Sequence, residues 1–84
     1  MKILLIEDDS ILNETITDYL KLKDNEVINL EDGTDAINVI DKSNFDLYII
    51  DINIPHVNGL EIVKYIRNKD IDTRCSTFKI QPRY

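Results

Sequence analysis

Acidic side chains follow two apolar segments of this chain. Residues 1–6 form the first segment and run directly into Glu7 and Asp8, and residues 45–50 form the second, which ends at Asp51. Each segment is apolar without the one-sided stripe of a helix, which is typical of a strand covered on both faces of a parallel sheet. If the two strands are parallel neighbours, their carboxyl ends meet at one edge of the sheet, where open α/β sheets bind ligands. The sequence therefore predicts that Glu7, Asp8 and Asp51 converge.

Three carboxylates at one point repel one another, and a divalent cation would relieve that repulsion. Oxygen ligands with no His or Cys among them suit Mg²⁺ or Mn²⁺ better than zinc. The lone His56 is interpreted as a loop residue rather than a ligand or a base. A simpler interpretation stays open for the first cluster, in which Asp8, Asp9 and Ser10 only cap the next helix and favour its dipole.

Further residues stand at fixed offsets from these carboxylates. Pro55 cannot supply a ladder N–H and ends the strand, and Gly59 permits a tight backbone before the next helical pattern. The complete ordered set is Glu7, Asp8, Asp32, Gly33, Ala36, Asp51, Asn53, Pro55 and Gly59. Over roughly residues 2–70 this set resembles the receiver domain of two-component response regulators, the phospho-acceptor partner of sensor histidine kinases.

The resemblance implies a function and a site. Asp51 would be the phospho-acceptor, whose carboxylate attacks the phosphorus of a phosphohistidine on the kinase. Mg²⁺ or Mn²⁺ would be held by Asp8, Asp51 and the backbone carbonyl of Asn53, with Glu7 acting through a bound water. Such a protein is a cytoplasmic signalling module rather than an enzyme.

Strands that alternate with helices predict an α/β fold, a parallel sheet with helices on both faces. The resemblance implies the flavodoxin-like, doubly wound class with strand order 2-1-3, here incomplete. The strands are expected at residues 1–6, 26–30 and 45–52. Apolar residues at helical spacing are expected to form the buried sides of the three helices: Leu12, Ile16, Tyr19 and Leu20, then Ala36, Val39 and Ile40, then Leu60, Val63 and Ile66.

The C-terminal part departs from the family pattern. Residues 1–71 are expected to form the N-terminal portion of a C-terminally truncated receiver, and residues 72–84 an atypical tail, irregular, swapped or a partial fourth strand. Family members carry a hydroxyl at the end of strand four, for which Thr77 is the candidate. They also carry a Lys at the end of strand five, which has no counterpart because Lys79 comes too early.

An incomplete sheet would leave the far side of the third strand as an open, apolar edge. Such an edge seeks a partner, because its backbone groups are unpaired. A homodimer formed through strand pairing or strand exchange is therefore predicted.

Composition narrows the choice of partners. The 84 residues allow one small domain, and a net charge of −6 without a basic cluster argues against nucleic acid or an anionic membrane as a direct partner. The single cysteine, Cys75, forbids an internal disulfide and fits a reducing cytoplasm. No signal peptide and no apolar run long enough to span a bilayer is recognised.

Two other interpretations stay open. The chain could be a receiver remnant that folds by self-association and lacks phospho-signalling competence. Alternatively, Asp51-x-Asn53 could be the nucleophile motif of a phosphatase of the haloacid dehalogenase type. That family generally requires a second Asp two residues on and places the motif on the first strand, so Asn53 on a third strand argues against it.

Overall fold

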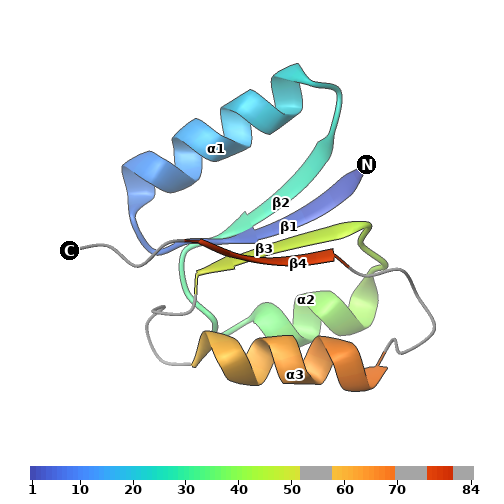
Figure 1. The fold of residues 1–84 in the computed structure, drawn as a ribbon. Coiled ribbons are helices and arrows are strands. Elements are labelled where there is room, and N and C mark those ends of the chain that lie inside the picture. Colours follow the sequence, from blue (N-terminus) through green and yellow to red (C-terminus); the bar gives the residue numbers. More distant parts are fainter. Residues whose placement is uncertain (52–57, 70–75, 81–84) are drawn as a thin grey trace.

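The computed structural model describes residues 1–51, 58–69 and 76–80. Within these residues, strands and helices alternate along the chain, and the strands form one sheet with helices on both sides (Figure 1). The elements in chain order are β1 (Lys2–Ile6), α1 (Ser10–Leu22), β2 (Glu26–Leu30), α2 (Ala36–Lys42), β3 (Leu47–Asp51), α3 (Gly59–Lys69) and β4 (Ser76–Ile80).

The sheet has the strand order β2-β1-β3-β4, and the paired strands are parallel. Strand β1 is central, and its residues from Ile3 to Ile6 are fully buried, as an apolar strand covered on both faces should be. Ile6 lies opposite Leu30 of β2 and Ile50 of β3, so the carboxyl ends of the three strands are level. The expected flavodoxin-like class and the order 2-1-3 of its first three strands are confirmed.

The fourth strand corrects the expectation of an open edge on β3. In the same chain, β4 pairs with β3 along its whole length, from Leu47 opposite Ser76 to Asp51 opposite Ile80. For this segment the sequence leaves three alternatives open, irregular, swapped or a partial fourth strand, and the structure has a strand, whose Thr, Phe and Ile are residues that favour strands. The open edge was the reason for predicting a homodimer, so the homodimer stays a prediction without that support. The division of the chain at residue 71 also stays a prediction.

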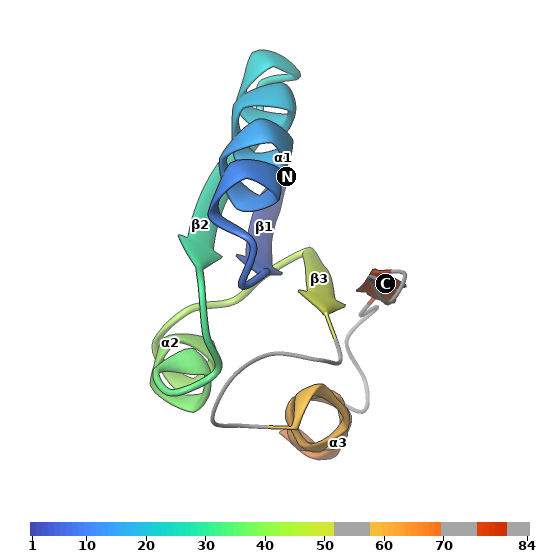
Figure 2. The ribbon, with the colours of Figure 1, turned by 90° about the vertical axis from the view of Figure 1, so that its left-hand side faces the viewer.

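The face of the sheet that carries α2 and α3 holds most of the buried core (Figure 2). Its fully buried helix residues include Ile40 of α2 and both Ile62 and Ile66 of α3. Leu60 was expected on the buried side of α3 but is 50% exposed. Ile62 and Ile66 are four residues apart and therefore share one face of the helix, which Leu60 does not reach.

The opposite face of the sheet is covered by α1 (Figure 2). Here the helix residues that are buried are polar, Asn13 and Thr17, while the flanking Ile16 and Leu20 are partly buried. Tyr19 was expected on the buried side and is 58% exposed. The helix is therefore turned slightly from the orientation that its apolar residues predict.

Within the described ranges, no helix has the length and apolar character needed to cross a membrane.

Candidate functional site

A cluster of carboxylates lies at the carboxyl ends of β1 and β3. Glu7 and Asp8 follow β1, Asp51 ends β3, and one oxygen of each lies within 4.8 Å of the others. The cause is the sheet register: Ile6 is paired with Ile50, so the residues that come next along each strand reach the same level. The structure thus brings together the three acidic residues that the sequence predicts to converge.

Burial makes this cluster unlike a set of surface acids. Glu7 is 0% exposed and Asp51 is 1% exposed, and Asp8 is half-buried. Carboxylates are seldom fully buried unless they are paired with a positive group or coordinate a metal. The donors are all oxygens, which is the ligand chemistry of Mg²⁺ and Mn²⁺ rather than of zinc. The donor set therefore fits a hard divalent cation, and the individual roles of these residues stay predictions.

The neighbouring acidic residues in the loop after β1 make different contacts. Asp9 is the N-cap of α1, and its side chain accepts a hydrogen bond of 3.1 Å from the backbone N–H of Leu12. The backbone N–H of Asp9 in turn donates to Oε2 of Glu7 at 2.9 Å. Capping is thus provided by Asp9, whereas Asp8 lies with the cluster. The interpretation that Asp8 only caps the helix is not supported.

Asn13 is a buried residue beside the cluster that no sequence motif indicates. Its side chain is 1% exposed and its Nδ2 donates to the backbone carbonyls of Glu7 and Leu30, each at 2.9 Å. The signal that could have identified it is its position: Asn13 is four residues after the Asp9 cap and lies between the apolar residues of α1. A polar residue at such a position must find hydrogen-bond partners, and the strand ends supply them.

The other motif residues are placed as follows. Ala36 is fully buried at the start of α2, and Gly59 is buried at the start of α3. Asp32 accepts a hydrogen bond of 2.8 Å from the backbone N–H of Thr34, which fixes the turn after β2. The predicted site residue Asn53 lies outside the described residues, and so do Pro55, His56 and Cys75.

Thr77, the candidate hydroxyl, does not lie at the carboxyl end of its strand. The register pairs Thr77 with Tyr48, whereas Ile80 is the residue opposite Asp51. Three residues of a strand rise by about 10 Å, so the backbone of Thr77 is far below the level of the acidic cluster. Thr77 therefore does not occupy the strand end at which family members carry the hydroxyl.

An open parallel sheet with helices on both faces and an acidic cluster at the ends of β1 and β3 defines a flavodoxin-like class of domain. The family model for the response regulator receiver domain matches residues 3–79, and the chain belongs to this family. The resemblance found in the motifs is confirmed. This family match argues against the phosphatase interpretation, since receiver domains are signalling modules and generally not enzymes.

Known relatives are similar over most of this chain. The transcriptional regulatory protein FlgR of Helicobacter pylori is 37% identical over 70 residues, which are 82% of this chain and 18% of that protein. The chain spans less than half the length of the curated relatives that it matches.

Solved structures agree with the fold. The response regulator protein TrrA of Thermotoga maritima, in complex with Mg²⁺-BeF, has a TM-score of 0.81 and 29% identity, covering 93% of this chain and 68% of that one. A complex of TrrA with the histidine kinase ThkA has a TM-score of 0.82 and 29% identity, covering 99% of this chain and 72% of that one.

Proposed function

We propose that this receiver domain accepts a phosphoryl group on Asp51 from a sensor histidine kinase, in a reaction that needs Mg²⁺ or Mn²⁺. The observation that carries the proposal is the convergence of Asp51 with Glu7 and Asp8, buried at the carboxyl ends of adjacent parallel strands. Two similar structures support it, because TrrA is solved both with Mg²⁺-BeF and with a histidine kinase.

The residues take distinct parts in this reaction. A carboxylate oxygen of Asp51 attacks phosphorus, the bond from phosphorus to the kinase imidazole nitrogen breaks, and the imidazole leaves with the electron pair. Asp8, Asp51 and the backbone carbonyl of Asn53 would hold the cation, and Glu7 would act through a bound water. The bound cation supplies charge neutralisation for the transferring phosphoryl group. The rigid strand ends hold the nucleophile in place, which is the contribution of the protein itself.

Phosphorylation by a small phosphodonor, acetyl phosphate, tests the nucleophile. We expect the wild-type chain to gain one phosphoryl group in the presence of Mg²⁺ and Asp51→Asn to gain none, as measured by intact-protein mass spectrometry. Asp35→Asn is the matched control, because Asp35 is an exposed carboxylate whose side chain makes no cap hydrogen bond at the start of α2. Label that persists in the Asp51 variant would place the nucleophile elsewhere.

A Mg²⁺ titration tests the cation site. We expect Asp8→Asn to weaken Mg²⁺ binding more than Asp9→Asn, because Asp8 belongs to the cluster while the Asp9 side chain caps α1. Asp9→Asn keeps a side-chain oxygen for the cap, so the fold is retained. An unchanged titration in the Asp8 variant would overturn the assignment. If the melting temperature does not change when Mg²⁺ and a phosphoryl mimic are added together, the alternative is favoured, in which the chain is a receiver remnant without phospho-signalling competence.

A further inference from the structure

A single buried amide connects the ends of two strands to the helix that covers them. The Nδ2 group of Asn13 donates both of its hydrogens, one to the carbonyl of Glu7 and one to the carbonyl of Leu30, at 2.9 Å each. Its Oδ1 accepts from Nδ2 of Asn29 at 2.7 Å and lies 3.5 Å from the hydroxyl of Thr17. Both donors and both acceptor sites of the amide are therefore used inside the protein.

The carbonyl of Glu7 has a particular importance, because it belongs to the peptide group that joins Glu7 to Asp8. A peptide group is planar, so fixing its oxygen fixes the direction in which the chain leaves Glu7 and enters Asp8. On the other side of Glu7, its backbone N–H donates to the carbonyl of Leu30 at 3.0 Å. The Leu30 carbonyl thus receives two hydrogen bonds, one from the Glu7 N–H and one from Asn13, and the backbone of Glu7 is held at both ends.

The amide is not required by the helix itself. The backbone N–H of Asn13 already bonds to the carbonyl of Asp9 at 2.8 Å, and an apolar side chain would fit the line of Leu12, Ile16 and Leu20. Burying an amide is unfavourable unless its hydrogen bonds are made. The value of Asn13 to the protein therefore lies in the backbone groups that its hydrogen bonds fix in place. Here they hold the backbone of one acidic residue and the start of the next.

We propose that Asn13 is a positioning residue for the acidic cluster, whose amide holds the Glu7–Asp8 peptide so that both carboxylates face Asp51. The proposal rests on the proposed function for its effect on Mg²⁺, while its effect on the backbone can be observed without any metal. Residues that orient metal ligands through hydrogen bonds typically change metal affinity by about 10-fold to 100-fold when they are replaced.

The first measurement compares Mg²⁺ affinity by calorimetric titration. Asn13→Leu keeps the side-chain size and removes all four hydrogen bonds, and we expect its affinity to fall about 10-fold. Asn29→Ala is the matched control, because it removes one bond of the same amide and leaves both carbonyl bonds intact. Ile16→Ala is a second control, which loosens the packing of α1 without touching the carbonyls. Equal losses in Asn13→Leu and Ile16→Ala would reduce Asn13 to a packing role and overturn the proposal.

The second measurement needs no metal. Amide hydrogen exchange, followed by NMR without Mg²⁺, reports on the N–H of Glu7, which bonds to Leu30, and on the N–H of Asp9, which bonds to Glu7 Oε2. In Asn13→Leu we expect both amides to exchange faster relative to those of β3, and in Asn29→Ala we expect no such change. Asn13→Ser, which keeps one hydroxyl donor, replaces Asn13→Leu if the larger change prevents folding.

The two measurements separate the possible failures. If the wild-type chain binds no Mg²⁺ while Asn13→Leu exposes the two amides, the proposed function fails and the positioning role stands. If the wild-type chain binds Mg²⁺ and Asn13→Leu binds it equally well with unchanged amide protection, the positioning role fails and the proposed function stands.

Discussion

The two faces of the sheet are held together in different ways. Among the described residues, the face covered by α2 and α3 buries a core cluster of nine residues, and the face covered by α1 buries a cluster of three. Leu47 and Ile49 of β3 point to the α1 face and are only partly buried. Because burial of apolar area is the main stabilising term, most of the folding free energy belongs to the α2–α3 face.

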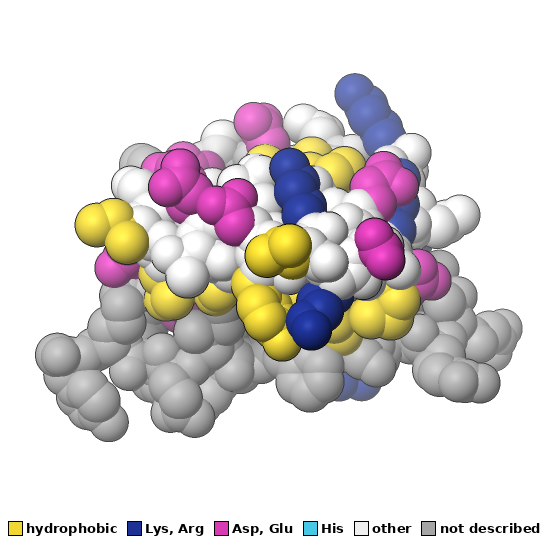
Figure 3. Space-filling model, turned by 90° about the horizontal axis from the view of Figure 1, so that it is seen from above, with side chains coloured by type: hydrophobic (Ala, Val, Ile, Leu, Met, Phe, Trp, Pro, Cys, Tyr) yellow, Lys and Arg dark blue, Asp and Glu magenta, His cyan; other side chains and the backbone are white. Residues whose placement is uncertain are grey.

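The α1 face carries polar structure in place of a large core. The buried residues of the helix are Asn13 and Thr17, and the hydrogen bonds of Asn13 run to the strand ends that bear the acidic cluster. Outward from the sheet, Figure 3 shows hydrophobic side chains among acidic and basic ones, and Ile11 and Leu22 of α1 are 79% and 80% exposed. One face of the sheet therefore supplies most of the stability, and the other carries the hydrogen bonds that reach the acidic cluster.

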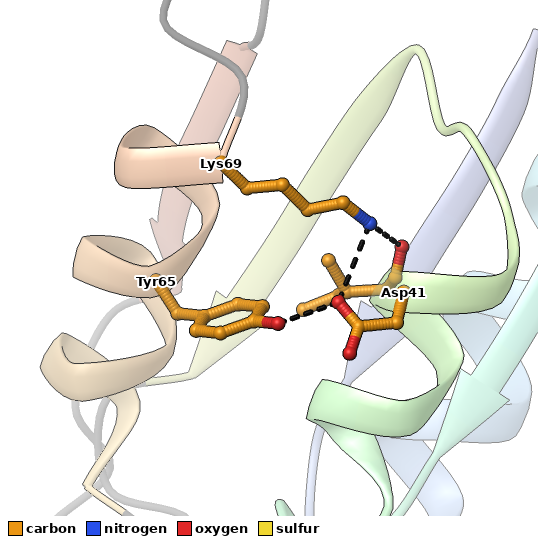
Figure 4. Close-up of polar contacts among 4 residues, drawn as sticks. Asp41, Tyr65 and Lys69 are labelled. Carbon is orange, nitrogen blue, oxygen red and sulfur yellow. Dashed lines mark hydrogen bonds and ion pairs between the residues drawn. The ribbon is translucent and has the colours of Figure 1, made fainter.

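The α2–α3 face has a polar contact of its own at the surface (Figure 4). The hydroxyl of Tyr65 donates to Asp41 Oδ1 at 2.5 Å. Lys69 Nζ donates to the carbonyl of Ile40 at 2.7 Å and lies 3.4 Å from Asp41. The cation therefore satisfies a carbonyl in the last turn of α2 and links the C-terminal turns of both helices.

The largest expected effect is a difference in stability between the faces. Ile66→Ala should lower the free energy of unfolding by about 2–5 kcal/mol, because Ile66 is fully buried in the larger cluster and its removal leaves a cavity. Ile16→Ala, on the half-buried side of α1, should cost about 1 kcal/mol. Urea unfolding of both variants measures the difference. Equal losses would contradict the asymmetry.

A smaller effect is expected on the pairing of β3, which borders both the large cluster and the acidic site. Because β1 and β4 pair with β3 within one chain, amides of residues 47–50 should stay protected from hydrogen exchange when the protein is diluted. Sedimentation velocity at the same concentrations tests the predicted homodimer. Protection that disappears as a dimer dissociates would show that the strand beside β3 comes from a second copy.

The sequence predicts the central part of this fold well, for a physical reason. Strand β1 and the end of β3 are buried on both faces, so their apolar runs and the carboxylates that follow them carry an unambiguous pattern. Parallel neighbours then place Glu7, Asp8 and Asp51 together with no further information.

The details that sequence reasoning missed depend on contacts between distant segments. The sequence offers a fourth strand only as one of three alternatives, because the segment has no continuous apolar run, and the pairing of β4 with β3 is visible only in three dimensions. Ile62 rather than Leu60 faces the core because of how α3 is rotated on the sheet. The position of Asn13 among the apolar residues of α1 indicates that it is buried, but its partners, the carbonyls of Glu7 and Leu30, come from other segments and are visible only in the structure.

The smallest expected effect concerns the surface contact between α2 and α3. The hydrogen bond from Tyr65, with Lys69 nearby, lowers the pKa of Asp41 below its ordinary value of 3.8, and burial opposes this only in part. The same hydrogen bond raises the pKa of Tyr65 above its ordinary value of 10.0. The contact needs an ionised Asp41 and a protonated Tyr65. It is therefore fully formed at pH values between the pKa of Asp41 and the pKa of Tyr65.

The sign of the pH dependence follows from these shifts. A carboxyl group with a lowered pKa in the folded chain stabilises the fold above pH 3.8, and this contribution is lost as the pH falls through the lower folded value. A phenol with a raised pKa stabilises the fold below pH 10.0, and its contribution is lost as the pH rises through the higher folded value.

Tyr65→Phe removes the donor and should return the pKa of Asp41 toward 3.8, with a slight fall in the urea midpoint near neutral pH that shrinks as Asp41 is protonated. Carboxyl NMR titration of Asp41 and urea unfolding between pH 7 and about pH 3 measure the two effects. Tyr19→Phe is the matched control, because Tyr19 is an exposed tyrosine on α1. If Tyr65→Phe leaves the Asp41 titration where it is in the wild type, Lys69 alone accounts for the shift. The contact between α2 and α3 would then depend on the apolar core and on the Lys69 ammonium, without a contribution from the Tyr65 hydroxyl.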